Sequence, residues 1–170
     1  KYEVERLNTQ QMVIKILINS CYGYMGNKNA PIGDDDIAAS VTLTGQAVIK
    51  YSNECLKDFI RDEVGADNIT AHDLEECIVY NDTDSSYISI APLIKNGVKF
   101  WEDQSKGLIH QETYDKIQEI EDRLNDDITA WARKALLTTD PRFVFKRECI
   151  ADVATFLQKK RYVMHILDDE

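Results

Sequence analysis

The sequence is poor in residues that break or cross-link a chain. Its 170 residues include only seven glycines, three prolines and four cysteines. So few glycines and prolines exclude a collagen-like or low-complexity chain. The cysteines (Cys21, Cys55, Cys77 and Cys149) are scattered, which excludes a disulfide framework and a zinc site of closely paired cysteines. We therefore expect free thiols in a reducing cytosol.

Basic residues, histidines and long apolar runs are also scarce. Lys and Arg number 20 against 30 Asp and Glu, a net charge of −10, which argues against a protein that holds nucleic acid by bulk charge but allows a local basic strip. The histidines (His72, His110 and His165) are isolated and form no metal-ligand pattern. No run approaches the roughly 18 apolar residues of a membrane span, so we expect a cytoplasmic protein without membrane contact.

Helix and strand patterns are both present. Apolar residues at spacings of three and four predict helices over residues 4–26, 34–61 and 114–137, with a polar loop at 65–73. Short β-prone runs lie at residues 78–80, 87–90, 143–145, 155–157 and 162–166. These patterns predict an α+β fold, with a small antiparallel sheet and helices packed to one side of it.

The first two β-prone runs flank a turn that carries two carboxylates, Asp82 and Asp84. In a regular strand both would lie on one face, and at a tight turn both would project into open space. Two nearby carboxylates repel, and a divalent cation offsets that repulsion. Mg²⁺ takes one or two carboxylates and fills its other positions with water and phosphate, so this run suits a phosphoryl-transfer metal site. The alternative is an ordinary turn, because Asn, Asp and Ser are common turn formers.

The first predicted helix carries a polar stripe beside an apolar side. Lys15, Asn19, Tyr22 and Gly26 are spaced four, three and four residues apart, which places them on one line. Such a line suits a nucleotide, since lysine meets phosphate as a point charge, the phenol ring offers a platform and glycine allows close approach. The alternative is a surface stripe that ends in a C-cap glycine.

The densest positive run of the chain is Lys159-Lys160-Arg161-Tyr162. In a strand, alternation would send Lys160 and Tyr162 one way and Lys159 and Arg161 the other. The run either contacts nucleic acid or forms a basic edge strand that prevents aggregation. Glu148, which opens the preceding predicted strand, is either a third carboxylate near the pair or half of a surface ion pair.

Together these runs resemble three motifs of family B DNA polymerases, in the order that the family has them. Residues 15–23 are similar to K-x-x-x-N-S-x-Y-G, and residues 159–162 to K-K-R-Y. Residues 80–85 resemble Y-G-D-T-D-S, with Asn81 where glycine is usual. The resemblance covers nearly all of the chain. Residues 7–11, 45–46 and 147–148 also look like the T4-type phage branch of the family.

The resemblance implies a domain organisation. Residues 1–27 would be the C-terminal helix of the fingers, and residues 28–170 would be part of the palm. The implied fold is the small antiparallel palm sheet with packed helices, preceded by the long fingers helix. The upstream aspartate motif D-x-x-S-L-Y-P, the exonuclease domain, the first fingers helix and the thumb would lie outside this chain. We therefore expect the chain to be inactive by itself.

The resemblance also implies roles for the acidic residues. Asp84 would be a ligand of two catalytic Mg²⁺ ions. Asp82 would be a second ligand, or it would orient a basic residue from outside the ligand shell. Glu148 would be an outer-shell carboxylate. By the same resemblance Asp84, Asp82 and Lys15 are the catalytic residues.

The other two motifs would bind substrates. Lys15 would stabilise the incoming deoxynucleoside triphosphate as it loses pyrophosphate, and Asn19 and Tyr22 would line the pocket of the nascent base pair. The expected DNA-binding residues are Gly23, Lys160, Arg161 and Tyr162. Lys160 would reach minor-groove acceptors that occur in every correct base pair, so it would test pairing without reading sequence.

The implied function is template-directed DNA synthesis by two-metal transfer of a deoxynucleotide to a primer 3′-hydroxyl. The expected partners are primer–template DNA, deoxynucleoside triphosphates and the remaining polymerase segments, in a host cytoplasm if a phage encodes the chain. The alternative is a non-catalytic DNA-binding or assembly module derived from a polymerase. Asp82, Asp84, Lys15 and Lys160 favour synthesis, because a module without the chemistry need not keep them.

Overall fold

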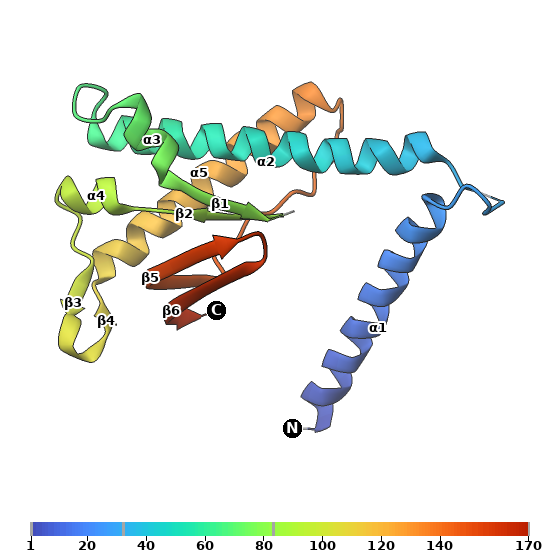
Figure 1. The fold of residues 1–170 in the computed structure, drawn as a ribbon, viewed down its shortest axis with the longest axis horizontal. Coiled ribbons are helices and arrows are strands. Elements are labelled where there is room, and N and C mark those ends of the chain that lie inside the picture. Colours follow the sequence, from blue (N-terminus) through green and yellow to red (C-terminus); the bar gives the residue numbers. More distant parts are fainter. Residues whose placement is uncertain (1, 32, 83, 170) are drawn as a thin grey trace. The chain divides into compact units, whose positions relative to one another are not determined.

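The computed structural model describes residues 2–31, 33–82 and 84–169. The chain forms two compact units, Lys1–Ala47 and Val48–Glu170. The elements of both units are drawn in Figure 1. Helix α2, Asp35–Val64, begins in the first unit and ends in the second.

Helix α1, Tyr2–Met25, confirms the first predicted helix (Figure 1). None of its described residues is buried. The predicted apolar side is at the surface, with Ile14 and Ile18 exposed at 57% and 63%. Ile16 and Leu17, which point in other directions, are exposed at 57% and 60%. The apolar side chains of α1 thus point to several sides of the helix and are exposed. The helix is held by its own backbone hydrogen bonds.

Helix α2 confirms the second predicted helix. Asp34 caps its start, because its carboxylate accepts hydrogen bonds from the backbone N–H groups of Asp36 (2.9 Å) and Ile37 (3.2 Å). The helix ends at Val64, three residues after the predicted end, and Gly65 follows with a φ of 89°.

The predicted loop at 65–73 is wrong in its last residues, where helix α3 (Ala71–Cys77) begins. A capping box starts this helix. The Thr70 hydroxyl accepts from the Asp73 N–H (3.2 Å), and the Asp73 carboxylate accepts from the Thr70 N–H (3.1 Å). Leu74 and Cys77 bury its inner side. A seven-residue helix is too short for its periodicity to show in the sequence.

The predicted hairpin is confirmed by strands β1, Ile78–Asp82, and β2, Ser85–Ile88, which pair antiparallel. Helix α4, Ala91–Lys95, follows the second β-prone run and is not among the predicted helices. The remaining elements are β3 (Trp101–Asp103), η1 (Gln104–Lys106), β4 (Leu108–Ile109), α5 (Gln111–Ala135), β5 (Cys149–Gln158) and β6 (Arg161–Asp169). Helix α5 confirms the third predicted helix.

The β-like run at residues 143–145 is not a strand. The side chain of Asn125, on α5, donates to the carbonyl of Phe145 (2.8 Å) and accepts from its N–H (2.8 Å). One amide side chain therefore provides the pairing that a neighbouring strand would give. Phe143 and Phe145 pack against the core, which explains their apolar character.

The α+β class is confirmed, with the antiparallel pairing of the described residues divided among three two-stranded sheets. The core of the second unit lies where α2 and α5 pack together (Figure 1). Phe59 and Ile60 of α2 are 2% and 1% exposed, and Ile128 of α5 is 0% exposed. The rings of Tyr51 and Trp131 stack with centroids 5.0 Å apart. This core supports the β1–β2 hairpin, whose Ile78 and Ile88 pack against it.

Candidate functional site

The two carboxylates lie at the corner of the β1–β2 hairpin, which we call the acidic corner (Asp82 and Asp84). Thr83, between them, lies outside the described residues. The Asp84 N–H donates to the Asp82 carbonyl at 2.6 Å, and Asp82 pairs with Ser85 in the strand register. Asp82 is half-buried and Asp84 is exposed. The corner thus offers one shielded carboxylate and one that faces solvent.

Lys160 reaches the acidic corner from the β5–β6 hairpin. Its Nζ lies 3.6 Å from an Oδ atom of Asp82, and the two side chains are 66% and 21% exposed. A pair this open to water adds about 0–1 kcal/mol to stability, so its main effect is on orientation. A basic residue thus lies beside Asp82, and the role of Asp82 in orienting it stays a prediction.

The prediction that Lys159 and Lys160 lie in a strand is wrong, because both form the turn between β5 and β6. Gln158 pairs with Arg161 across this turn. Lys160 has a φ of 62°, the left-handed conformation that tight hairpin turns require. Strand alternation therefore applies only to Arg161 and Tyr162, which begin β6.

Four aromatic rings join the two hairpins, and we call them the aromatic cluster (Tyr80, Tyr87, Phe156 and Tyr162). Their ring centroids lie 5.3–6.2 Å apart. The Tyr87 hydroxyl donates to the Tyr162 hydroxyl at 2.7 Å, and this bond together with burial raises the pKa of Tyr87. The Lys160 N–H donates to the Tyr80 hydroxyl at 3.0 Å. Residues far apart in the sequence are thereby joined beside the acidic corner.

Neither Tyr87 nor Phe156 was a predicted site residue. The available signal was their aromatic character within the two β-prone runs. Each of the four strands contributes one ring, and rings on facing strand surfaces pack against one another. The sequence does not reveal which strands pack against one another.

Asn81, which stands where the family usually has glycine, is bonded through its side chain. The Ser86 hydroxyl lies 2.8 Å from Asn81 Oδ1 and 3.3 Å from Asn53 Oδ1 of helix α2. One hydroxyl proton serves one acceptor at a time, so the two amides share it. This network links the hairpin to α2. Asn53 was not a predicted site residue, because it belongs to none of the sequence motifs.

Glu148 is exposed and lies directly before β5. Its negative charge makes a small contribution to the raised pKa of Tyr87. Across residues 2–31, 33–82 and 84–169, no three His, Cys, Asp or Glu side chains gather as a metal site. The acidic corner nevertheless suits Mg²⁺ in donor chemistry, since this ion takes one or two carboxylates and keeps water or phosphate as its other ligands.

The residues of the predicted polar stripe lie along α1 in the first unit. Lys15, Asn19, Tyr22 and Gly23 are all exposed. A Cβ atom added at Gly23 would meet nothing within 4 Å, so the helix surface is open there. Gly26 directly follows α1 without the positive φ of a left-handed C-cap glycine. The exposed stripe is available to a ligand.

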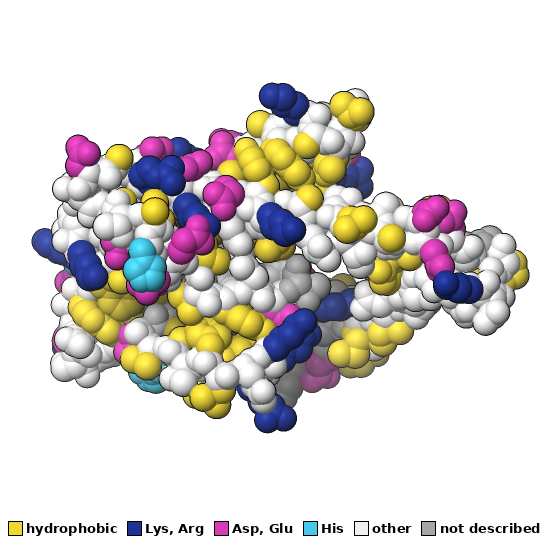
Figure 2. All heavy atoms as spheres, turned by 45° about the horizontal axis from the view of Figure 1, so that its top comes forward, with side chains coloured by type: hydrophobic (Ala, Val, Ile, Leu, Met, Phe, Trp, Pro, Cys, Tyr) yellow, Lys and Arg dark blue, Asp and Glu magenta, His cyan; other side chains and the backbone are white. Residues whose placement is uncertain are grey.

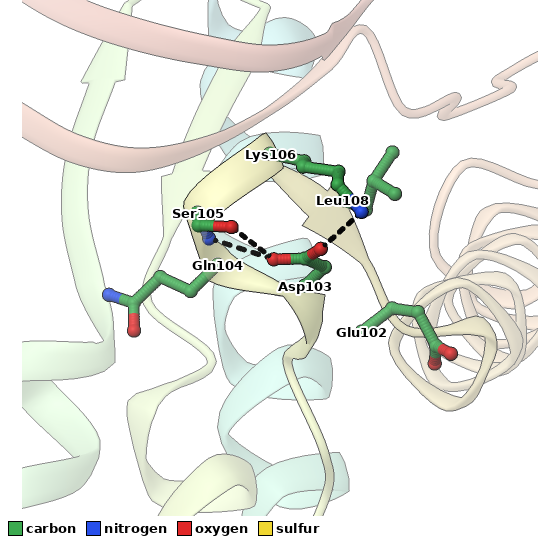
Figure 3. Close-up of a pocket in the computed structure, with 6 residues that line it drawn as sticks. All are labelled: Glu102, Asp103, Gln104, Ser105, Lys106 and Leu108. Carbon is green, nitrogen blue, oxygen red and sulfur yellow. Dashed lines mark hydrogen bonds and ion pairs between the residues drawn. The ribbon is translucent and has the colours of Figure 1, made fainter.

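Two hollows lie elsewhere in the second unit. The larger, about 840 Å³, is lined by Glu102, Asp103, Gln104, Ser105, Lys106 and Leu108 (Figure 3). There Asp103 accepts from the N–H and hydroxyl of Ser105 and pairs with Lys106 at 2.8 Å, contacts that lower its pKa. None of its lining residues is a predicted site residue. The second, about 480 Å³, includes Asn53 and Asn81 in its lining.

The surface carries apolar groups among its charges (Figure 2). On the β5–β6 hairpin, Val153, Leu157 and Val163 are exposed at 61%, 75% and 72%. Among the described helices, none is both long and apolar enough to cross a membrane.

Comparison with known proteins agrees with the motifs. The family model "DNA polymerase family B" matches residues 1–122. The DNA polymerase of Pyramimonas orientalis virus is 34% identical over 92 residues, which cover 54% of this chain and 6% of that protein. The DNA-directed DNA polymerase of Enterobacteria phage T4 is 32% identical over 88 residues, 52% of this chain and 9% of that protein.

A third relative extends over the basic turn as well. The DNA polymerase catalytic subunit of Equine herpesvirus 1 is 25% identical over 171 aligned residues, 95% of this chain and 12% of that protein. The chain therefore spans only a small part of the length of these relatives. No solved structure matches it. Since the family model covers well over half of the residues, the chain belongs to DNA polymerase family B.

Proposed function

We propose that this chain supplies part of the palm and one fingers helix of an enzyme that extends a DNA primer by template-directed nucleotidyl transfer. The observation that carries the proposal is the contact between Asp82 and Lys160, which joins two motifs across the fold at 3.6 Å. A carboxylate corner beside a lysine is suited to a site where metal ions and a nucleic-acid backbone meet.

In the proposed reaction the primer 3′-oxygen attacks the α-phosphorus of a deoxynucleoside triphosphate in line. The new P–O bond forms as the bond to pyrophosphate breaks, and the hydroxyl proton leaves to solvent. Bound Mg²⁺ would polarise the phosphate oxygens and favour deprotonation of the hydroxyl. Asp84, exposed at the corner, would hold the metal, while Asp82 would orient Lys160 and Glu148 would act from outside the ligand shell.

The exposed stripe of α1 would bind the nucleotide. Lys15 would meet the triphosphate and stabilise the charge that develops on pyrophosphate as it leaves. Asn19 and Tyr22 would line the pocket of the nascent base pair. The open surface at Gly23 would allow the duplex to approach the helix backbone.

The β5–β6 turn would hold the primer duplex. Lys160, with 66% of its side chain exposed, has room to reach minor-groove acceptors while its ammonium stays near Asp82. Arg161 and Tyr162 begin β6 directly after it. Because the chain has a net charge of −10, few phosphate contacts would come from this chain and its own salt-dependent affinity would be weak.

The organisation we propose assigns residues 1–27 to the fingers and 28–170 to the palm. Two-metal chemistry requires a further aspartate, so this chain would act together with the polymerase segments that carry it. We place the chain in the T4-type branch on the strength of residues 7–11, 45–46 and 147–148. Its site of action would then be the cytoplasm of an infected host.

The second candidate is a non-catalytic assembly module derived from a polymerase. The observation that favours it is helix α1, which has no buried residue and exposes many apolar side chains. Such a surface suits association with another polypeptide.

A complementation assay tests the proposal. The chain is mixed with a polypeptide that carries the remaining segments of a family B polymerase, together with primer–template, Mg²⁺ and nucleotides. We expect primer extension that falls about a thousandfold or more with Asp84→Ala, because a lost metal ligand costs several kcal/mol in the transition state. Asp67→Ala, at an exposed carboxylate in the loop before α3, is the matched control and should extend normally. Stable association without extension would favour the assembly module.

A further inference from the structure

The turn that presents Lys160 adopts an unfavourable backbone conformation. Lys160 is a non-glycine residue with positive φ (62°). For an L-residue other than glycine, the left-handed region is disfavoured by about 5–30-fold in population. The pairing of β5 with β6 imposes this conformation on the turn, and a further contact that binds the turn in this form adds to its stability.

Tyr80 provides such a contact. Its hydroxyl accepts the backbone N–H of Lys160 at 3.0 Å, so it binds the main chain of the turn and leaves the lysine side chain to reach Asp82. Tyr80 and Asp82 both lie on the half-buried side of β1, two residues apart. One strand face therefore holds the turn and also receives its ammonium group.

The Tyr80 ring is itself fixed in place. It packs against Phe156 with centroids 5.3 Å apart and against Tyr87 at 5.7 Å. A phenylalanine at this position would keep the ring contacts and lose only the hydroxyl. Tyr87 offers the matched control, because its hydroxyl bonds to Tyr162 at 2.7 Å.

We propose that Tyr80 is a positioning residue whose hydroxyl holds the β5–β6 turn in register, so that the Lys160 ammonium stays at the acidic corner. The consequence for primer handling rests on the proposed function of Lys160. The hydrogen bond and its effect on the turn do not depend on that function.

Amide hydrogen exchange, measured by NMR on the full chain, tests the contact itself. Tyr80→Phe should speed exchange of the Lys160 amide about five- to tenfold, the amount that one net hydrogen bond supplies. Tyr87→Phe should change it by less than about twofold. An unchanged Lys160 exchange rate in Tyr80→Phe would overturn the proposal.

A second variant tests the same hydrogen bond in case Tyr80→Phe does not fold. Lys160→Gly allows the left-handed φ without strain and keeps the N–H that Tyr80 binds. With Tyr80 in place, the amide at position 160 should stay protected as in the unmodified chain. Exchange as fast as in an open loop would contradict the proposed bond.

Kinetics of the complemented enzyme separate positioning from general support. Tyr80→Phe should raise KM for primer–template about fivefold with kcat within about twofold, and should have no further effect when combined with Lys160→Ala. Additive effects in the double variant would overturn the positioning role. If Lys160→Ala alone leaves KM unchanged, the DNA contact proposed for Lys160 fails, and the exchange measurement still decides the role of Tyr80.

Discussion

Helix α1 and the β1–β2 hairpin each carry one of the three motifs, yet they are held in different ways. In α1 no described residue is buried, and Lys15, Asn19 and Tyr22 share a line because helix geometry puts them there. In the hairpin, Asp82 faces Lys160, which belongs to another hairpin. The first arrangement is local, and the second exists only in the folded second unit.

The difference has a consequence for the effects of substitutions. Side chains of α1 can be changed with little cost to the fold, so their effects should report on ligand binding. Around the acidic corner, the aromatic cluster and the α2–α5 core give both support and position. A substitution there must be separated into its effect on stability and its effect on the site.

The largest difference should appear in stability. Ile128 is 0% exposed and Ile16 is 57% exposed. Ile128→Ala should lower the free energy of unfolding by about 3–4 kcal/mol, because it removes buried methyl groups and leaves a cavity. Ile16→Ala should change it by less than about 0.5 kcal/mol.

Urea unfolding followed by circular dichroism and by tryptophan fluorescence, with Trp101 replaced by Phe in both variants so that Trp131 alone emits, measures both effects. Trp131 lies on α5 beside the core and stacks on Tyr51, so its emission reports on the same region. An equal loss in the two variants would show that α1 is packed as tightly as α5, which would remove the contrast between the regions.

A substitution of Lys15 in α1 should change activity and leave stability unchanged. In the complementation assay Lys15→Met should slow extension about a hundredfold, the usual effect of losing one donor to developing charge, and leave the unfolding midpoint unchanged. Lys28→Met is the control, at another exposed lysine of the first unit, whose ammonium pairs with Asp35 at 3.0 Å. Equal slowing in both variants would show that extension depends on positive charge in general and not on Lys15 in particular.

The smallest expected effect concerns the start of helix α3. Thr70→Ala removes the hydroxyl that accepts from the Asp73 N–H and should cost about 1 kcal/mol of unfolding free energy. Ser40→Ala, at an exposed hydroxyl inside α2, is the comparison and should be nearly neutral. Differential scanning calorimetry of both variants checks this. No change in Thr70→Ala would mean that packing alone holds α3.

The capping box of α3 also predicts that the stability of the fold depends on pH. Hydrogen bonds from the Thr70 side chain and backbone lower the pKa of Asp73 in the folded chain. A lowered folded-state pKa contributes stability above the unfolded value of about 3.9, and this contribution is lost as the pH falls below it. Asp73→Asn should therefore weaken the fall in stability as the pH drops below about 4. An unchanged acid profile would contradict this assignment.

The errors of sequence interpretation have particular physical causes. The apolar run at 143–145 looks like a strand, but Asn125 of α5 supplies its hydrogen bonds. Lys159 and Lys160 continue a strand-like pattern, yet the register of Gln158 with Arg161 makes them the turn. At residues 143–145 a partner distant in sequence determines the backbone, and at residues 159–160 the pairing register of two adjacent strands does. Single-residue preferences carry no information about either.

Local signals were sufficient for the three long helices, the β1–β2 hairpin and the α+β class, because caps, periodicity and turn residues act over a few positions. The motifs and their order were enough to indicate the polymerase family. Folding was required to bring Lys160 to Asp82 and Tyr80 to the Lys160 backbone. Those contacts join strands separated by a long helix, and they depend on how side chains pack across the interior, which no local preference encodes.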